Sequence, residues 1–165
     1  MAKRALVVGV SSYGFPNDLP SCARDAEAFG SMLETFYRFD HVRVLKDGEA
    51  TRDGVDRGLE RLFHDAEPND RLVFFFSGTG CRFEKGGTIG EALVLQDGRL
   101  LNDHHLTERT ENLPPGVFTA VLDCCFSGLR SSRACRAAPT SRTCPGSSSS
   151  RRWAGACSPT TSRRS

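Results

Sequence analysis

The stretch VFTAVLDCCFSG, residues 117–128, decides the fold of this chain. Its first half is a nearly continuous apolar run, the pattern of a parallel strand that is covered by helices on both faces. Its second half turns polar at Asp123, Cys124 and Cys125, where such a strand would end. Because chemistry gathers outside the carboxyl ends of strands in open α/β sheets, the stretch predicts a reactive cysteine there. The alternative is that both cysteines pack as small apolar side chains.

Three further apolar runs precede this stretch, at residues 4–10, 42–45 and 72–76. The last of them, LVFFF, predicts a central strand buried on both faces, and we expect it to stop at Ser77. Two helical patterns separate the runs, with Ser21 and Thr51 as candidate N-caps. Apolar residues recur behind these caps at three- and four-residue spacing: Cys22, Ala26, Phe29, Met32, Leu33 and Phe36, then Val55, Leu59, Leu62 and Phe63.

The segment between the third and fourth strands is glycine-rich. Residues 77–90 predict no regular structure, whereas residues 91–98 predict a small hairpin turned at Gln96-Asp97-Gly98. A short helix should follow near Leu106, capped by Asn102 or Asp103 and closed by Leu113. Strands that alternate with helices favour right-handed crossovers, so the predicted fold class is α/β, a three-layer domain with a mostly parallel sheet of about four strands.

Composition narrows the function further. No apolar run approaches the ~20 residues of a transmembrane helix, and the apolar start is too short for a signal peptide, which points to the cytoplasm and to no membrane partner. The seven cysteines show no CxxC spacing, which favours reduced thiols over a disulfide framework or a metal site. Gly78-Thr79-Gly80 begins a GxGxxG pattern, but Phe83 breaks it, so the sequence predicts no nucleotide and no other cofactor.

Charge divides the chain into two parts. Of its 22 basic residues eight lie in 129–165, so 14 accompany all 20 acidic residues in 1–128. We therefore expect a domain at 1–128 and a basic, low-complexity, disordered tail at 129–165. The tail lacks interleaved aromatic residues, which argues against nucleic-acid binding. Its abrupt enrichment in Arg, Ser, Pro and Ala is typical of a GC-rich gene read in a shifted frame.

With the strands placed, four segments resemble landmarks of a known family. ALVVGV (5–10), PSCARDA (20–26), LVFFFSGTG (72–80) and VLDCCFSG (121–128) are similar to those of the caspase and metacaspase superfamily of cysteine peptidases, in its bacterial, metacaspase-like branch. The match covers nearly all of 1–128. It implies a caspase-like three-layer fold whose C-terminal part is missing here, which would leave a raw sheet edge at the fourth strand.

The resemblance also implies roles for single residues. Family members carry SGHG and DxCxSG, so the nucleophile would be Cys125, and Thr79 stands where the family has its general-base histidine. Gly78 is a candidate oxyanion donor together with the amide of Cys125. Alternation along the strand sends Cys124 to the opposite side from Cys125, so only one of them can face the SGTG loop.

The resemblance implies a specificity pocket as well. Cys22, Asp25 and Asp123 match its positions, and two carboxylates in one pocket favour a peptide or protein substrate with Arg or Lys before the scissile bond. The Gln-Ala-Cys signature of the aspartate-specific animal branch is absent.

Threonine cannot accept a proton at neutral pH, which predicts an impaired cysteine endopeptidase. His104 and His105 are candidate substitutes for the base, or else solvated loop residues; His41 and His64 lie near the wrong ends of their elements. The alternative function is a non-catalytic caspase-like module that binds basic peptides or partner proteins.

Overall fold

Four parallel strands form the centre of the computed structural model, which describes residues 1–14, 16–85 and 87–131. They are β1 (Lys3–Gly9), β2 (His41–Lys46), β3 (Arg71–Lys85) and β6 (Phe118–Ser131). β1 pairs with β2 on one side and with β3 on the other, and β6 pairs with the far edge of β3. The predicted parallel sheet and its four strands are confirmed.

Two antiparallel strands extend this sheet beyond the expected four. β3 does not stop at Ser77 but continues to Lys85, where it turns back into β4 (Thr88–Val94), and β4 pairs with β5 (Leu100–Asn102). The expectation of irregular structure at 77–90 was therefore wrong. Glycines lower intrinsic strand propensity, but pairing on both edges of β3 overrides that preference here. The hairpin that was predicted at 91–98 corresponds to the β4–β5 turn.

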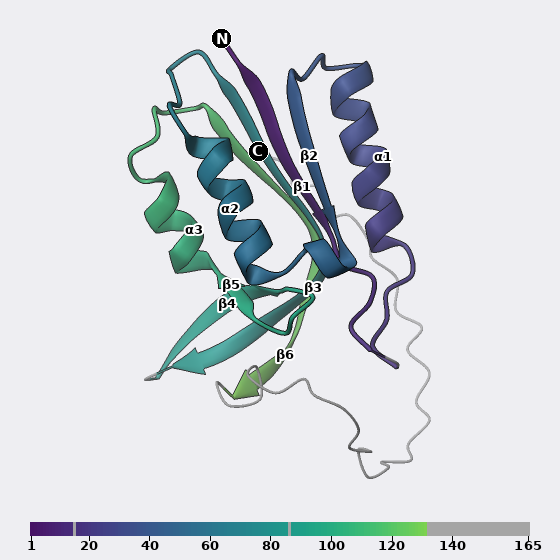
Figure 1. Ribbon diagram of the computed structural model, residues 1–165. Coiled ribbons are helices and arrows are strands. Elements are labelled where there is room, and N and C mark those ends of the chain that lie inside the picture. The colour runs from purple at the N-terminus through teal and green to yellow at the C-terminus, as the bar shows by residue number, and fades with distance from the viewer. Residues whose placement is uncertain (15, 86, 132–165) are drawn as a thin grey trace, which may run out of the picture.

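Helices cover both faces of the sheet. α1 (Cys22–Thr35) lies on one face, and α2 (Arg52–Phe63) and α3 (Asp103–Thr110) lie on the other, as Figure 1 shows. A single 3-10 turn, η1 (Asp47–Glu49), joins β2 to α2. Two predicted caps are confirmed by side-chain hydrogen bonds, since Thr51 accepts from the Gly54 amide and Asn102 from the His105 amide. Ser21 occupies the N-cap of α1, but its side chain makes no cap hydrogen bond.

Strand alternation divides the buried apolar residues into two clusters. Leu6, Val8, Phe74 and Phe76 belong to the cluster beneath α2, which supplies Val55, Leu59 and Leu62. Ala5, Val7 and Phe75 belong to the cluster beneath α1, which supplies Ala26 and Leu33. LVFFF is thus buried on both faces, as predicted. The prediction failed for Phe36, which follows the last turn of α1 and is 77% exposed, because the chain turns away from the sheet there.

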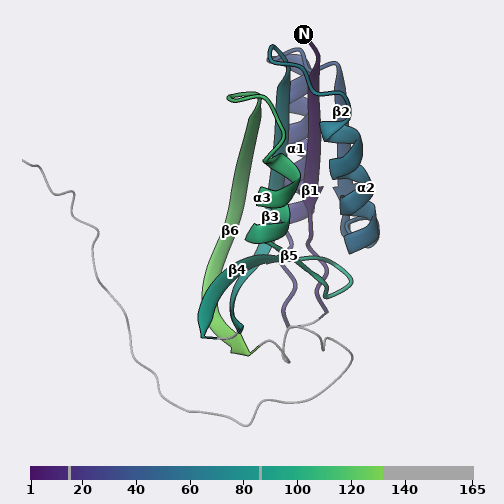
Figure 2. The same ribbon diagram turned by 90° about the vertical axis from the view of Figure 1, so that its left-hand side faces the viewer.

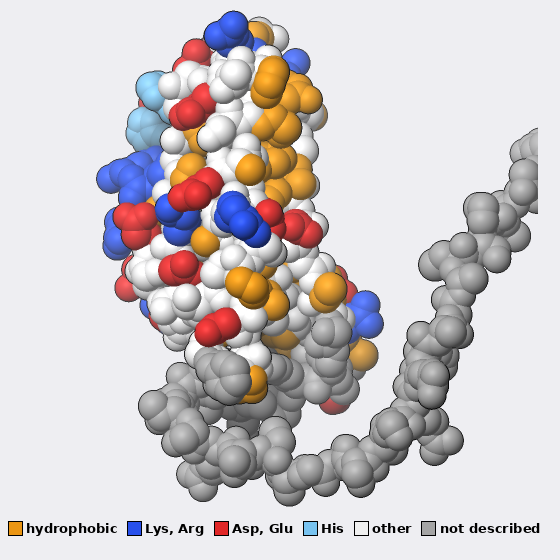
Figure 3. Space-filling view, turned by 90° about the vertical axis from the view of Figure 1, so that its right-hand side faces the viewer, with side chains coloured by type: hydrophobic (Ala, Val, Ile, Leu, Met, Phe, Trp, Pro, Cys, Tyr) orange, Lys and Arg blue, Asp and Glu red, His pale blue; other side chains and the backbone are white. Residues whose placement is uncertain are grey.

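β6 forms the margin of the sheet and, within the described residues, pairs with β3 alone (Figure 2). The outer edge of β6 is therefore open as far as residues 1–131 are described, as expected from the sequence. An apolar groove lies between α1 and β6, lined among others by Phe29, Met32, Val73 and Val121. Figure 3 shows hydrophobic side chains gathered along this margin. Residues 132–165, most of the predicted disordered tail, lie outside the described residues. Among the described helices, none is long and apolar enough to cross a membrane.

Candidate active site

A cavity of about 440 Å³ lies beside the carboxyl end of β1, where β3 and β6 continue side by side. Five of the six site residues predicted from the sequence line it, and Asp25 is the exception. Its walls come from the loop before α1, from the first residue of α1 and from the two neighbouring strands: Leu19, Ser21, Cys22, Ser77, Gly78, Thr79, Leu122, Asp123, Cys124 and Cys125.

The register of β3 and β6 brings positions 79 and 125 together. Thr79 is the direct partner of Cys125, and Ser77 is the direct partner of Asp123. Directly paired residues in a sheet project to the same face, so the side chains of both pairs lie on the α1 side. Ser77 Oγ donates a hydrogen bond to Asp123 Oδ2 at 3.1 Å. A base at position 79 would therefore stand next to the Cys125 thiol, one same-face step beyond the Ser77–Asp123 pair.

Burial separates the two adjacent cysteines. Cys125 is exposed, whereas Cys124 projects to the opposite face and packs against the α2-side cluster. Burial, the Asp123 carboxylate and the neighbouring Cys125 raise the pKa of the Cys124 thiol to about 11. Since only the thiolate is strongly nucleophilic, Cys124 is a poor nucleophile near neutral pH. The geometry therefore favours Cys125 as the reactive thiol.

The first turn of α1 places Cys22 against the cavity. Gly9 makes this possible, because a Cβ on Gly9 would lie 2.5 Å from Cys22 O and 2.6 Å from Ala26 Cβ. Ser11 Oγ accepts the Ala23 amide at 2.9 Å and fixes the same turn. Asp25 is half-buried in α1, one residue before Ala26, so the structure brings Asp123 and Cys22 together but does not place Asp25 in the cavity wall.

Gly78 lies on the β3–β6 ladder. Leu72 N donates to Val117 O at 2.8 Å, and alternation along a parallel ladder then points the Gly78 and Cys125 amides at the opposite strand. Both candidate oxyanion donors thus face the ladder, and they would become available to a substrate only where this pairing loosens.

Two residues of the site were not found from the sequence. Ser77 was expected only to end a strand, although it holds Asp123. Tyr13 lies in the turn after β1, and its phenol oxygen accepts the Thr79 amide at 2.9 Å. The sequence around Tyr13 indicates only a turn, and the contact could not be predicted because Thr79 lies 66 residues away in the chain.

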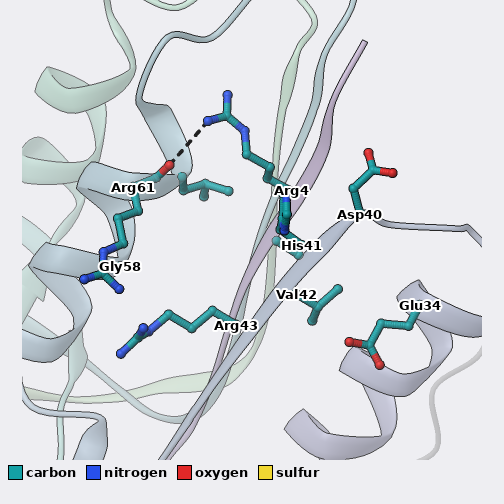
Figure 4. Close-up of a pocket in the computed structure, with 10 residues that line it drawn as sticks. Arg4, Glu34, Asp40, His41, Val42, Arg43, Gly58 and Arg61 are labelled. Atoms are coloured by element: carbon teal, nitrogen blue, oxygen red, sulfur yellow. Dashed lines mark hydrogen bonds between the residues drawn. The ribbon is translucent and has the colours of Figure 1, made fainter.

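None of the four histidines lines this cavity. His104 is exposed on α3, and His105 Nε2 lies 3.1 Å from Asp56 Oδ1 and 3.0 Å from Arg109 Nε, which ties α3 to α2. His41 lies at the amino end of β2, in the separate cavity that Figure 4 shows.

That second cavity is lined by charged side chains of both signs. It lies along the open edge of β2 and combines Arg43 and Arg61 with Glu34 and Asp40 (Figure 4). Its position at the opposite ends of the strands separates it from Cys125.

Comparisons with known proteins agree on one family. The chain is 33% identical to Metacaspase-1 of Scheffersomyces stipitis over 144 residues, which cover 76% of this chain and 36% of that protein. It is 31% identical to Metacaspase-1 of Meyerozyma guilliermondii, with 76% and 35% covered. The chain thus spans about a third of the length of these curated relatives.

A solved structure shares the fold. The crystal structure of a protein from Geobacter sulfurreducens matches with a TM-score of 0.67 and 22% sequence identity, covering 78% of this chain and 52% of that one. The family model described as "Metacaspase, peptidase C14 domain" matches residues 3–131, which include every element that surrounds Cys125. This chain therefore belongs to the metacaspase family of caspase-like peptidases, within peptidase C14.

Proposed function

We propose that residues 3–131 are the nucleophile-bearing part of a cysteine endopeptidase that cleaves after Arg or Lys, and that Thr79 impairs its catalysis. The observation that carries this proposal is the direct pairing of Thr79 with Cys125 on one face of two parallel strands. A histidine in that place would lie within reach of the thiol, whereas a threonine hydroxyl has no useful basicity near pH 7. The reduced thiols of the site suit the cytoplasm, where we place the protein.

The preference for a basic residue is supported by the acidic side of the cavity. Asp123 is exposed to the cavity, and its orientation is fixed by the hydrogen bond from Ser77 Oγ. Among the residues that the structure describes, no ion pair neutralises Asp123, so its carboxylate is available to a guanidinium or an ammonium group. We propose that Asp25, which is half-buried in the first turn of α1, belongs to the same pocket, as the family resemblance implies.

A second candidate function is a non-catalytic module that binds basic peptides or partner proteins. The specific observation in its favour is that the substitution at position 79 leaves the Ser77–Asp123 hydrogen bond in place. Recognition of a basic side chain depends on that pair, whereas proton transfer depends on position 79. The module would therefore retain binding without turnover.

The decisive experiment restores the base. We expect Thr79→His to raise cleavage of Arg and Lys peptide substrates, because a positioned general base contributes about 10²–10⁴-fold, or roughly 3–5 kcal/mol of barrier. Cys125→Ala in the same background should abolish the gain. Cys124→Ala is the matched control and should leave most of it, since Cys124 projects away from Thr79. Cleavage is followed by release of a fluorophore from peptides with Arg, Lys or Asp before the bond.

Each result has a distinct meaning. A folded but inert Thr79→His variant would contradict the claim that the base is what limits this domain. Cleavage by the unmodified protein that is lost in Cys125→Ala would contradict the claim of impairment. Binding of an Arg peptide that survives Cys125→Ala but is lost in Asp123→Asn, without turnover in any variant, would support the binding module.

A further inference from the structure

We propose that Tyr13 is the positioning residue of this site, because its phenol holds the backbone at position 79 and thereby directs that side chain at Cys125. The inference deepens the proposed peptidase function and rests on it. Tyr13 Oη accepts the Thr79 amide at 2.9 Å and donates to Val94 O at 2.9 Å. One hydroxyl thus connects the turn after β1 with β3 and β4.

The location of this contact explains why it is needed. On the edge of β3 that faces β1, strand pairing ends at the Gly9–Ser77 pair, and pairing with β4 begins at the Gly80–Leu93 pair. The Thr79 amide lies in the gap between these two partner strands. Thr79 is half-buried, and a backbone amide that is shielded from water without a partner is costly. Tyr13 supplies the acceptor that no strand provides. The phenol therefore substitutes for a missing stretch of sheet at the one position where the family carries its base.

Tyr13 is itself firmly held. Asp18 Oδ1 accepts the amides of Tyr13 and Gly14, each at 2.8 Å, and the ring packs against the α2-side cluster. The neighbouring glycine makes room for it, because a Cβ on Gly78 would lie 2.5 Å from Tyr13 Oη. The same Cβ would lie 2.8 Å from Phe76 Cζ, so Gly78 leaves room in β3 for the phenol and for the Phe76 ring, independently of any contact with substrate.

The phenol must stay protonated to donate to Val94 O. Burial is the main cause that raises the pKa of Tyr13 to about 12, partly offset by its hydrogen bond with Thr79. Tyr13 consequently remains a neutral donor and acceptor throughout the pH range in which a cysteine peptidase works. Tyr13 therefore acts by holding the Thr79 backbone in place and not by carrying a charge.

The test uses Tyr13→Phe, which removes only the hydroxyl, in both the unmodified and the Thr79→His proteins. Tyr37→Phe is the matched control, since Tyr37 is the other tyrosine of the chain and is 57% exposed. In the unmodified protein, we expect hydrogen exchange at the Thr79 amide to become at least tenfold faster in Tyr13→Phe and to stay unchanged in Tyr37→Phe. Gly78→Ala, which keeps the hydroxyl but places a Cβ 2.5 Å from Tyr13 Oη and 2.8 Å from Phe76 Cζ, should also speed this exchange.

In the Thr79→His background, Tyr13→Phe should lower kcat by about tenfold or more while KM changes less than about twofold, because orientation of the base is lost but the Asp123 pocket is kept. The pH profile of Cys125 alkylation gives a readout without turnover. An imidazole held next to Cys125 lowers the pH midpoint of alkylation below the value of an ordinary thiol. Tyr13→Phe should raise that midpoint again.

Unchanged exchange at the Thr79 amide would overturn the proposed contact. Faster exchange with an unchanged kcat and an unchanged alkylation midpoint would overturn the positioning role and leave Tyr13 as a structural residue. If Thr79→His is folded but inert with Tyr13 intact, the claim that position 79 limits catalysis fails instead, and the alkylation midpoint alone then decides the role of Tyr13.

Discussion

Gly9→Ala tests whether close packing of α1 on β1 builds the wall of the cavity. Gly9 is the last residue of β1, and its missing side chain faces the first turn of α1. An added Cβ would lie 2.5 Å from Cys22 O, 2.6 Å from Ala26 Cβ and 2.9 Å from Ala23 Cα. Two of these three atoms belong to the backbone, so no rotamer change relieves the overlap and the helix itself must move.

The expected cost follows from that geometry. Overpacking a close-packed core costs typically about 1–3 kcal/mol, and backbone contacts place this substitution in the upper half of that range. With a urea m value of about 2 kcal/mol/M, the unfolding midpoint should fall by roughly 1 M or more. Gly48→Ala is the control, because nothing lies within 4 Å of its Cβ position and it should change stability by less than about 0.5 kcal/mol.

A second measurement links this packing to the site. Cys22 is buried, so we expect it to resist alkylation in the native protein and to become more reactive in Gly9→Ala, where the first turn of α1 is displaced. Equal urea midpoints for Gly9→Ala and the unmodified protein would refute the reasoning. An equal loss in Gly48→Ala would also refute it, since the effect would then reflect glycine replacement in general.

Two further predictions concern ionisable groups. Near pH 8, Cys125 should be alkylated at least tenfold faster than Cys124, because burial, Asp123 and Cys125 raise the pKa of the Cys124 thiol to about 11. Peptide mapping by mass spectrometry measures both alkylation rates. Equal rates would contradict the assignment of Cys125 as the reactive thiol. Asp56→Asn should lower the urea midpoint at pH 7, and the difference should shrink as the pH falls below about 4 and through the lowered pKa of Asp56. Partial burial opposes ionisation of Asp56, yet hydrogen bonds from Arg52 and His105 hold its pKa below the ordinary value, so its stabilisation is lost on acidification. A difference in midpoint that is independent of pH would argue against this.

The parallel centre of the fold could be read from the sequence because its signals are local. LVFFF and the apolar half of VFTAVLDCCFSG need burial on both faces, and helical spacing separates the earlier runs. The continuation of β3 to Lys85 could not be read, because it depends on β4 and β6 pairing with both edges of a glycine-containing segment. Phe36 was misassigned for a related reason: helical spacing continues past Thr35, but the chain leaves the sheet there.

The candidate site likewise contains residues that could be predicted from the sequence and residues that could not. Cys125, Asp123, Cys22 and Thr79 were predicted from motifs that stand next to strand and helix ends, and the structure gathers them around one cavity. Tyr13 was missed because its role is a contact across the fold. Thr79 could be matched to the family's histidine position from the sequence, but the place of this residue directly opposite Cys125 depends on the strand register.

The residues proposed for recognition and those proposed for chemistry occupy successive same-face steps of one ladder, roughly 7 Å apart along the strands. The Ser77–Asp123 pair forms the first step, and the Thr79–Cys125 pair forms the second. Because the steps share no side chain, a change at position 79 need not disturb the acidic pocket, and a change at Asp123 need not move the thiol. If the proposed roles hold, we expect Thr79→His to alter proton transfer alone and Asp123→Asn to alter recognition alone. Measuring peptide binding and turnover on both variants separates an impaired peptidase from a binding module by the step at which each function is lost.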